Sequence, residues 1–115
     1  MSKFDEAMDT YKGEMDKLGI KYDANLLQAV AKGLGPSIYN NDANKVSCSQ
    51  ESELETVKKN FLVGKLGLSE SDDLAGACSK VCEQMGSSNR NKYRAIFYYL
   101  LVKHYKKENV YASAS

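Results

Sequence analysis

The 115-residue chain contains no tryptophan, only one proline and one histidine, and three cysteines. With a single proline, little interrupts helices, and no stretch shows the strict polar and apolar alternation that a half-buried strand needs. Helix-favouring Lys, Glu, Leu, Ala and Met are abundant instead. Hydrophobic residues make up 43% of the chain, enough to bury one core. We therefore expect a single all-α domain over residues 1–111, followed by a flexible tail at 112–115.

Signals for export or for a membrane are also missing. No apolar run approaches the roughly 18 residues that a membrane-spanning helix needs, and the N-terminal residues lack the apolar core of a signal peptide. The odd number of cysteines does not suggest a disulfide scaffold. These absences predict a soluble cytoplasmic protein that makes no membrane contact.

Apolar spacing predicts five main helices in an orthogonal bundle. They cover residues 3 to 18, the stretch from the N-cap Asp23 to 34, residues 50 to 66, a stretch ending at 85, and one from a Ser87 or Ser88 cap to about 107. A short extra turn is expected at 37–39. In the last helix, residues 95–102 are apolar on nearly every face, which is typical of a helix enclosed by neighbours. We expect this helix to be central.

One loop carries part of a calcium-binding pattern. Asp42, Asn44 and Glu53 would occupy positions 1, 3 and 12 of an EF-hand loop. Position 5 would then be Val46, and position 6, which needs glycine for its sharp turn, would be Ser47. Ordinary helix capping explains the same residues. We predict no metal site, although a helix-loop-helix shape of EF-hand type without metal fits the pattern.

The cysteines and the histidine give little support to chemistry. Cys78 and Cys82 lie four residues apart and share a helix face with apolar residues, which favours core packing over a zinc or redox site. Cys48 is in a loop and is the better candidate for a reactive thiol. His104 has no carboxylate or nucleophile near it in sequence. We predict no catalytic residue and no cofactor.

Charge is distributed unevenly along the chain. Residues 1–57 carry 6 basic and 10 acidic side chains, whereas residues 58–115 carry 10 basic and 5 acidic ones. Six basic residues and no acidic residue lie between Gln84 and Lys107. This asymmetry is compatible with an anionic partner, but folding of the acidic half against the basic half explains it more simply.

The start of the last helix holds the one candidate site. Its residues bear hydroxyl groups or positive charge: Ser87, Ser88, Arg90, Lys92 and Arg94. Each cation in the first turns of a helix opposes the macrodipole by about 0.3 to 1 kcal/mol. A bound phosphate or carboxylate would relieve this repulsion, because free backbone N–H groups also point there. Carboxylates from the first helix, from Glu83, or from Asp72 and Asp73 are the favoured alternative.

Four segments of the chain, residues 33–39, 46–49, 58–62 and 82–94, together resemble a family of small bacterial proteins catalogued only as a domain of unknown function. The resemblance spans essentially residues 1–111. It implies a small, soluble, all-helical bacterial domain. It implies no activity, cofactor or catalytic residue.

Two hypotheses for function follow. The first is a non-enzymatic module that binds another protein or a second copy of itself, and it rests on the lack of a nucleophile-base pair, an acid pair or a complete metal set. The second is an anion or nucleic-acid binder that uses the five residues at the start of the last helix, with a nucleic acid as the less favoured ligand.

Overall fold

Helices make up almost all of the regular structure. The computed structural model describes residues 3–39, 45–46, 48, 50–69, 74–86, 92–107 and 111. In chain order its elements are α1 (Lys3–Lys17), α2 (Ala24–Leu34), a 3-10 helix (Gly35–Tyr39), α3 (Glu51–Thr56) with a π-helical continuation (Val57–Val63), α4 (Leu74–Met85) and α5 (Arg94–Tyr105). In this part of the chain, none of the helices has the length and apolar character needed to span a membrane. The predicted all-α bundle of five helices is confirmed.

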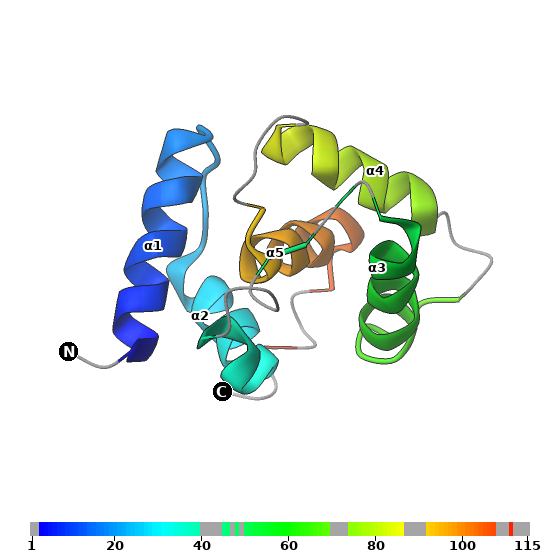
Figure 1. Cartoon of the computed structure of the whole chain (residues 1–115), viewed down its shortest axis with the longest axis horizontal. Helices are drawn as coiled ribbons and strands as arrows, with labels where there is room; N and C mark the ends of the chain where they lie inside the picture. The colour runs from blue at the N-terminus through cyan, green and yellow to red at the C-terminus, as the bar shows by residue number, and fades with distance from the viewer. Residues whose placement is uncertain are drawn as a thin grey trace.

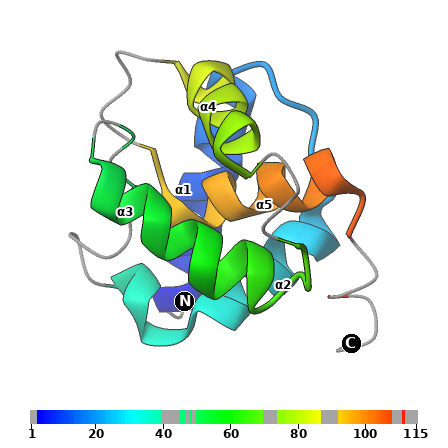
Figure 2. The ribbon, with the colours of Figure 1, turned by 90° about the vertical axis from the view of Figure 1, so that its right-hand side faces the viewer.

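Helix α5 is the centre of the bundle. All eight residues from Ala95 to Val102 are buried, so no face of this stretch reaches solvent. Figures 1 and 2 show α5 surrounded by the other helices, and α1, α2 and α4 all contact it. On the side of α3 and its π-helical continuation, the rings of Phe61 and Tyr98 stack with their centroids 4.0 Å apart. The prediction of a central last helix is confirmed.

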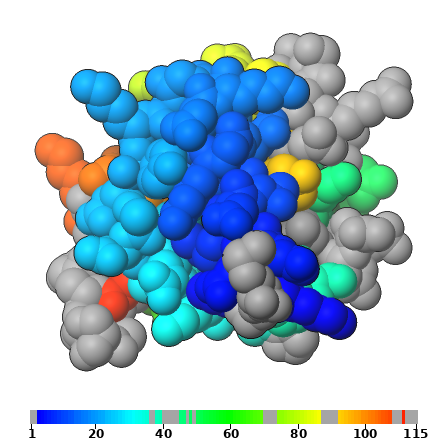
Figure 3. Space-filling model, turned by 90° about the vertical axis from the view of Figure 1, so that its left-hand side faces the viewer, coloured from blue at the N-terminus to red at the C-terminus, as the bar shows by residue number. Residues whose placement is uncertain are grey.

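Helix α1 covers one side of the bundle with a single apolar stripe. Met8, Tyr11 and Met15, spaced three and four residues apart, are its buried residues. Gly19 follows the helix with φ +73°, and the amide of Ile20 donates to the carbonyl of Met15 at 2.9 Å. Figure 3 shows that the opposite face of α1 forms much of this side of the surface. The helix therefore contributes to the core along one stripe only.

The start of α2 is tied to α5 by one hydrogen bond. Asp23 is the N-cap as predicted, and its carboxylate accepts from the amides of Asn25 and Leu26 at 3.0 and 3.4 Å. The backbone amide of Asp23 itself donates to the Tyr99 hydroxyl at 2.7 Å. A buried tyrosine on the central helix thus finds its polar partner at the first turn of its neighbour.

The third helix departs from the prediction in its second half. A regular helix was expected over residues 50 to 66, but the backbone widens to a π-helix after Thr56. The amides of Gly64 and Leu66 donate to carbonyls five residues earlier, at 3.1 and 2.9 Å. A Cβ atom on Gly64 would lie only 2.7 Å from the carbonyl oxygen of Asn60. Over two turns, apolar spacing alone cannot distinguish the two helix types.

The last helix begins later than predicted. A cap at Ser87 or Ser88 was expected, but α5 starts at Arg94 with Tyr93 as its N-cap, and residues 87–91 lie outside the described part of the chain. Instead of joining a helix, Lys92 accepts a hydrogen bond from the amide of Val46 at 2.8 Å, and Tyr93 forms an isolated antiparallel bridge with Lys45. This long-range backbone pairing stops the helix from extending toward the N-terminus.

Tyr111 packs against the bundle after the end of α5. It is only 5% exposed, and a Cβ on Gly33 would lie 3.5 Å from its ring. The Nζ of Lys65 lies 5.3 Å from the ring centroid. Burial, with a smaller contribution from Tyr98, raises the pKa of Tyr111 to about 12.

We expect Tyr99→Phe to lower the free energy of unfolding by about 1 kcal/mol, because the Asp23 amide loses its acceptor without any loss of apolar volume. Denaturant unfolding measures the change. The matched control is Tyr39→Phe, at a residue that is 48% exposed, and it should change stability by less than about 0.5 kcal/mol. Equal effects of the two substitutions would contradict the role given to the Tyr99 hydroxyl.

Alkaline titration should reveal Tyr111. Its pKa in the folded protein lies above the ordinary value of 10.0, so its contribution to stability is complete below pH 10 and is lost as the pH rises through about 12. Tyrosinate absorbance should therefore show a late-titrating group that Tyr111→Phe removes and Tyr39→Phe does not. If Tyr111→Phe left the late part of the titration unchanged, the assignment would be wrong.

Candidate functional site

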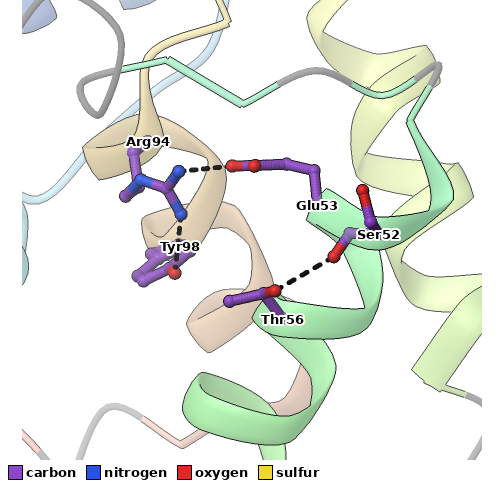
Figure 4. Close-up of polar contacts among 5 residues, drawn as sticks. All are labelled: Ser52, Glu53, Thr56, Arg94 and Tyr98. Atoms are coloured by element: carbon purple, nitrogen blue, oxygen red, sulfur yellow. Dashed lines mark hydrogen bonds and ion pairs between the residues drawn. The ribbon is translucent and has the colours of Figure 1, made fainter.

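Arg94, at the start of α5, contacts Glu53 and Tyr98 (Figure 4). Its guanidinium is ion-paired with the Glu53 carboxylate on α3, and it donates a hydrogen bond to the Tyr98 hydroxyl at 3.1 Å. The Arg94 and Glu53 side chains are 14% and 27% exposed. Burial by itself lowers the pKa of Arg94, but the contacts with Tyr98 and Glu53 outweigh that effect, so the net shift is upward. The arrangement fastens α3 to α5.

The sequence favoured pairing of the basic residues with carboxylates of the same chain. Arg94 is paired in this way, but its partner is a carboxylate that was not predicted. The expected partners were the first helix, Glu83, or Asp72 and Asp73. Glu53 lies 41 residues before Arg94 in the chain. Its carboxylate reaches Arg94 because α3 and its continuation pack across α5. No local pattern in the sequence links two residues at that separation.

The other predicted site residues do not gather into a described anion site. Lys92 precedes the helix and is only 7% exposed. Ser87, Ser88 and Arg90 lie outside the described residues. Because α5 begins at Arg94, Lys92 is not in its first turn, and the predicted conflict between several cations and the helix dipole is reduced to Arg94. The anion site therefore stays a prediction.

Glu53 was also the candidate for position 12 of a calcium loop. The residues at positions 1 and 3 of that pattern, Asp42 and Asn44, lie outside the described part of the chain. Val46, at position 5, is a buried core residue. Glu53 itself is ion-paired with Arg94. These two described residues therefore have structural roles.

Two of the three cysteine predictions are wrong. Cys48 and Cys82 form a disulfide, with their Cα atoms 6.2 Å apart, so Cys48 is not a free thiol and Cys82 is not a free apolar core residue. Residues 45–46 pair with residues 92–93, just before α5, and the disulfide joins Cys48 to α4; neither contact has a signature in the local sequence. Cys78 is 1% exposed, which confirms its place in the core, and burial raises the pKa of its thiol.

A groove between α4 and α5 was not predicted. It has a volume of about 590 Å³ and is lined by Lys80, Val81, Glu83, Gln84, Leu100, Lys103 and His104. Val81 and Leu100 are buried and form an apolar floor, whereas the other lining residues are exposed. The only signal for it in the sequence is that both sets of residues are spaced three and four apart, which places each set on one helix face. Their meeting depends on how α4 packs on α5.

His104 is the groove residue to which the sequence gave no role. It is exposed near the end of α5, and its ring makes an edge contact with Tyr105, with the centroids 4.9 Å apart. Its place beside Lys103 agrees with the expectation that positive charge gathers at a helix C-terminus. It lies at the rim of the groove, where a bound molecule would meet it.

A protein-family model matches most of the chain. The model of the family described as "Protein of unknown function (DUF2853)" matches residues 10–109. The chain belongs to the DUF2853 family. This confirms the resemblance seen in its segments, while bacterial origin stays a prediction. No curated protein matches the chain. The DUF2853 description names no activity.

Substitution of Arg94 tests the contact between α3 and α5. Arg94→Ala should lower the free energy of unfolding by about 1 to 2 kcal/mol, because Glu53 and Tyr98 lose a shared charged partner in a half-buried position. A double-mutant cycle with Glu53→Ala isolates the coupling between the two side chains.

The control for that cycle is the Lys58–Glu55 pair, whose atoms lie 2.5 Å apart but whose glutamate is 62% exposed. Its coupling should stay below about 0.5 kcal/mol. The Arg94–Glu53 contact would have no special role if its coupling energy did not exceed that of this surface pair.

Proposed function

We propose that this DUF2853 protein is a non-enzymatic interaction module, and that the α4–α5 groove binds an acidic segment of a partner protein. The observation that supports this proposal is the composition of the groove. An apolar floor of Val81 and Leu100 lies within a polar and charged rim, as in sites that anchor one apolar side chain of a peptide. A volume of about 590 Å³ has room for such a side chain and its neighbours.

The charge of the rim supports an acidic partner. Lys80 on α4 and Lys103 on α5 contribute positive charge to the groove, and Glu83 contributes one negative charge. Lys106, at the C-cap of α5, is exposed just beyond the lining residues. The carboxylates of a peptide with an apolar anchor would therefore be attracted by a positive potential as the peptide approaches the groove and when it is bound at the rim. An acidic segment is the chemistry that this arrangement complements.

The rest of the described surface favours binding through the groove over binding through a broad apolar interface. Among the described residues, Tyr39 is the one large hydrophobic side chain that is exposed. Stable interfaces between copies usually contain a larger apolar centre. Self-association through a flat apolar patch therefore has less support than binding of a segment.

The alternative function, anion or nucleic-acid binding through Ser87, Ser88, Arg90, Lys92 and Arg94, gains no support from the two described members of that set. Arg94 is held by Glu53 and Tyr98, and Lys92 is largely buried. We also assign no catalytic residue. We also propose a cytoplasmic location, as expected from the lack of a signal peptide and of a disulfide scaffold, although Cys48 and Cys82 are paired.

Titration with designed peptides tests the groove. A labelled peptide with one leucine flanked by glutamates should bind. The same peptide with glutamines in place of the glutamates should bind with an affinity at least about tenfold lower. In amide NMR spectra the acidic peptide should shift the resonances of the α4 and α5 residues that line the groove. Raised salt should weaken the interaction, because the charges are exposed.

The variant Lys80→Glu with Lys103→Glu should reduce the affinity at least about tenfold. Its matched control is Lys3→Glu with Lys17→Glu on α1, which makes the same change in net charge at exposed residues far along the chain. An equal loss in both double variants would show nonspecific attraction and overturn the proposal. Groove resonances that shift with protein concentration alone would identify a second copy as the occupant and contradict the choice of partner.

A further inference from the structure

The Cys48–Cys82 disulfide joins two parts of the chain that are 34 residues apart. Cys48 precedes α3 and forms, with Lys45 and Val46, a short segment of described residues, and Cys82 lies in the last turn of α4. We propose that this bond is a reversible redox site, and that its reduction by a dithiol loosens these three residues from α4 and from the start of α5. The inference does not depend on what occupies the α4–α5 groove.

Both cysteines of the disulfide are partly exposed. Cys48 and Cys82 are each partly exposed, in contrast to Cys78, which is 1% exposed. Exchange between thiols and disulfides requires a thiolate to approach one sulfur directly, so access largely decides which bonds can be reduced in the folded protein.

The third cysteine does not compete for the bond. Cys78 lies one helical turn before Cys82 and shares its helix face. Its thiol is buried, and burial raises its pKa, so it stays protonated and is a poor nucleophile. Because Cys78 does not exchange into the bond, the disulfide always joins Cys48 and Cys82. Reduction and oxidation involve the same two residues each time.

Among the described residues of this segment, Lys45 and Val46 contact the residues just before α5. The Val46 amide donates to the Lys92 carbonyl at 2.8 Å, and the Val46 side chain is 4% exposed. Lys45 forms the isolated bridge with Tyr93 and places its Nζ 5.7 Å from the centre of that ring. These contacts, and the packing of Val46 and Cys48 against the core, remain when the disulfide is reduced. Loss of the covalent tie to α4 should lower the free energy at which this segment opens.

Loosening of this segment affects a junction of three helices. Residues 92 and 93 lead directly into Arg94, the first residue of α5, and Arg94 is paired with Glu53 on α3. The disulfide adds α4 to the same junction. Most of the core, including the buried stretch of α5, lies elsewhere. Reduction should therefore change one end of the bundle while the fold persists.

The chemistry is a two-electron exchange. A thiolate of a protein or small-molecule dithiol attacks one sulfur of the Cys48–Cys82 bond and forms a mixed disulfide, and the other cysteine leaves as a thiolate that takes up a proton. The second thiol of the reductant then displaces the remaining cysteine. Two thiols form on this protein, and the reductant becomes a disulfide.

Hydrogen exchange and thiol alkylation together test the proposal. After denaturation without reductant, the oxidised protein should show one alkylatable cysteine, Cys78, and the protein treated with a dithiol while folded should show three. Exchange of the Val46 amide should become at least about tenfold faster on reduction. The Asp23 amide, bonded to Tyr99 in another part of the bundle, should change less than about twofold.

Two variants separate redox control from general loss of stability. Cys48→Ser should give the fast Val46 exchange in both oxidising and reducing buffer. Cys78→Ala should keep the difference between the two buffers even if its overall stability falls. Three alkylatable thiols after equilibration with excess oxidised dithiol would overturn the proposal, as would a bond that a dithiol reduces only after the protein unfolds. Unchanged Val46 exchange on reduction would also overturn it.

Discussion

The complete enclosure of α5 is the constraint on which the rest of the structure depends. Eight consecutive residues are buried on every side, so other helices have to cover every face of this one. Two of the enclosed residues are tyrosines, whose hydroxyls need polar partners in the core. Tyr99 accepts from the Asp23 amide at the start of α2, and Tyr98 accepts from Arg94, which also binds Glu53 on α3. Enclosure and polar satisfaction together fix where α2 and α3 lie.

The α4–α5 groove forms where this enclosure ends. Leu100 is still buried, while Lys103 and His104, one turn later on the same face, are exposed beside α4. The groove thus combines apolar surface from the core with charge from the end of a helix, where cations are favoured by the helix dipole. This is why the proposed binding chemistry, an apolar anchor with acidic neighbours, follows from the architecture rather than from a sequence motif.

The opposite end of α5 is controlled by backbone pairing and a covalent bond. Residues 92 and 93 pair with residues 45 and 46 and do not extend the helix, and the disulfide from Cys48 joins that segment to α4. Of the cations in the candidate anion site, Lys92 is buried here and Arg94 contacts Glu53 and Tyr98. One end of the central helix therefore carries the proposed redox site, and the other carries the proposed binding groove.

The sequence alone determined the features that repeat at helical spacing. It predicted the all-α class, the five helices, the Asp23 cap and the central last helix, because periodicity and capping act over three or four residues. Only the tertiary structure decided the π-helical turns, the late start of α5, the Glu53–Arg94 pair, the Cys48–Cys82 bond and the groove. The Glu53–Arg94 pair and the disulfide join residues 41 and 34 positions apart. Such contacts depend on how the helices pack, which no local pattern encodes.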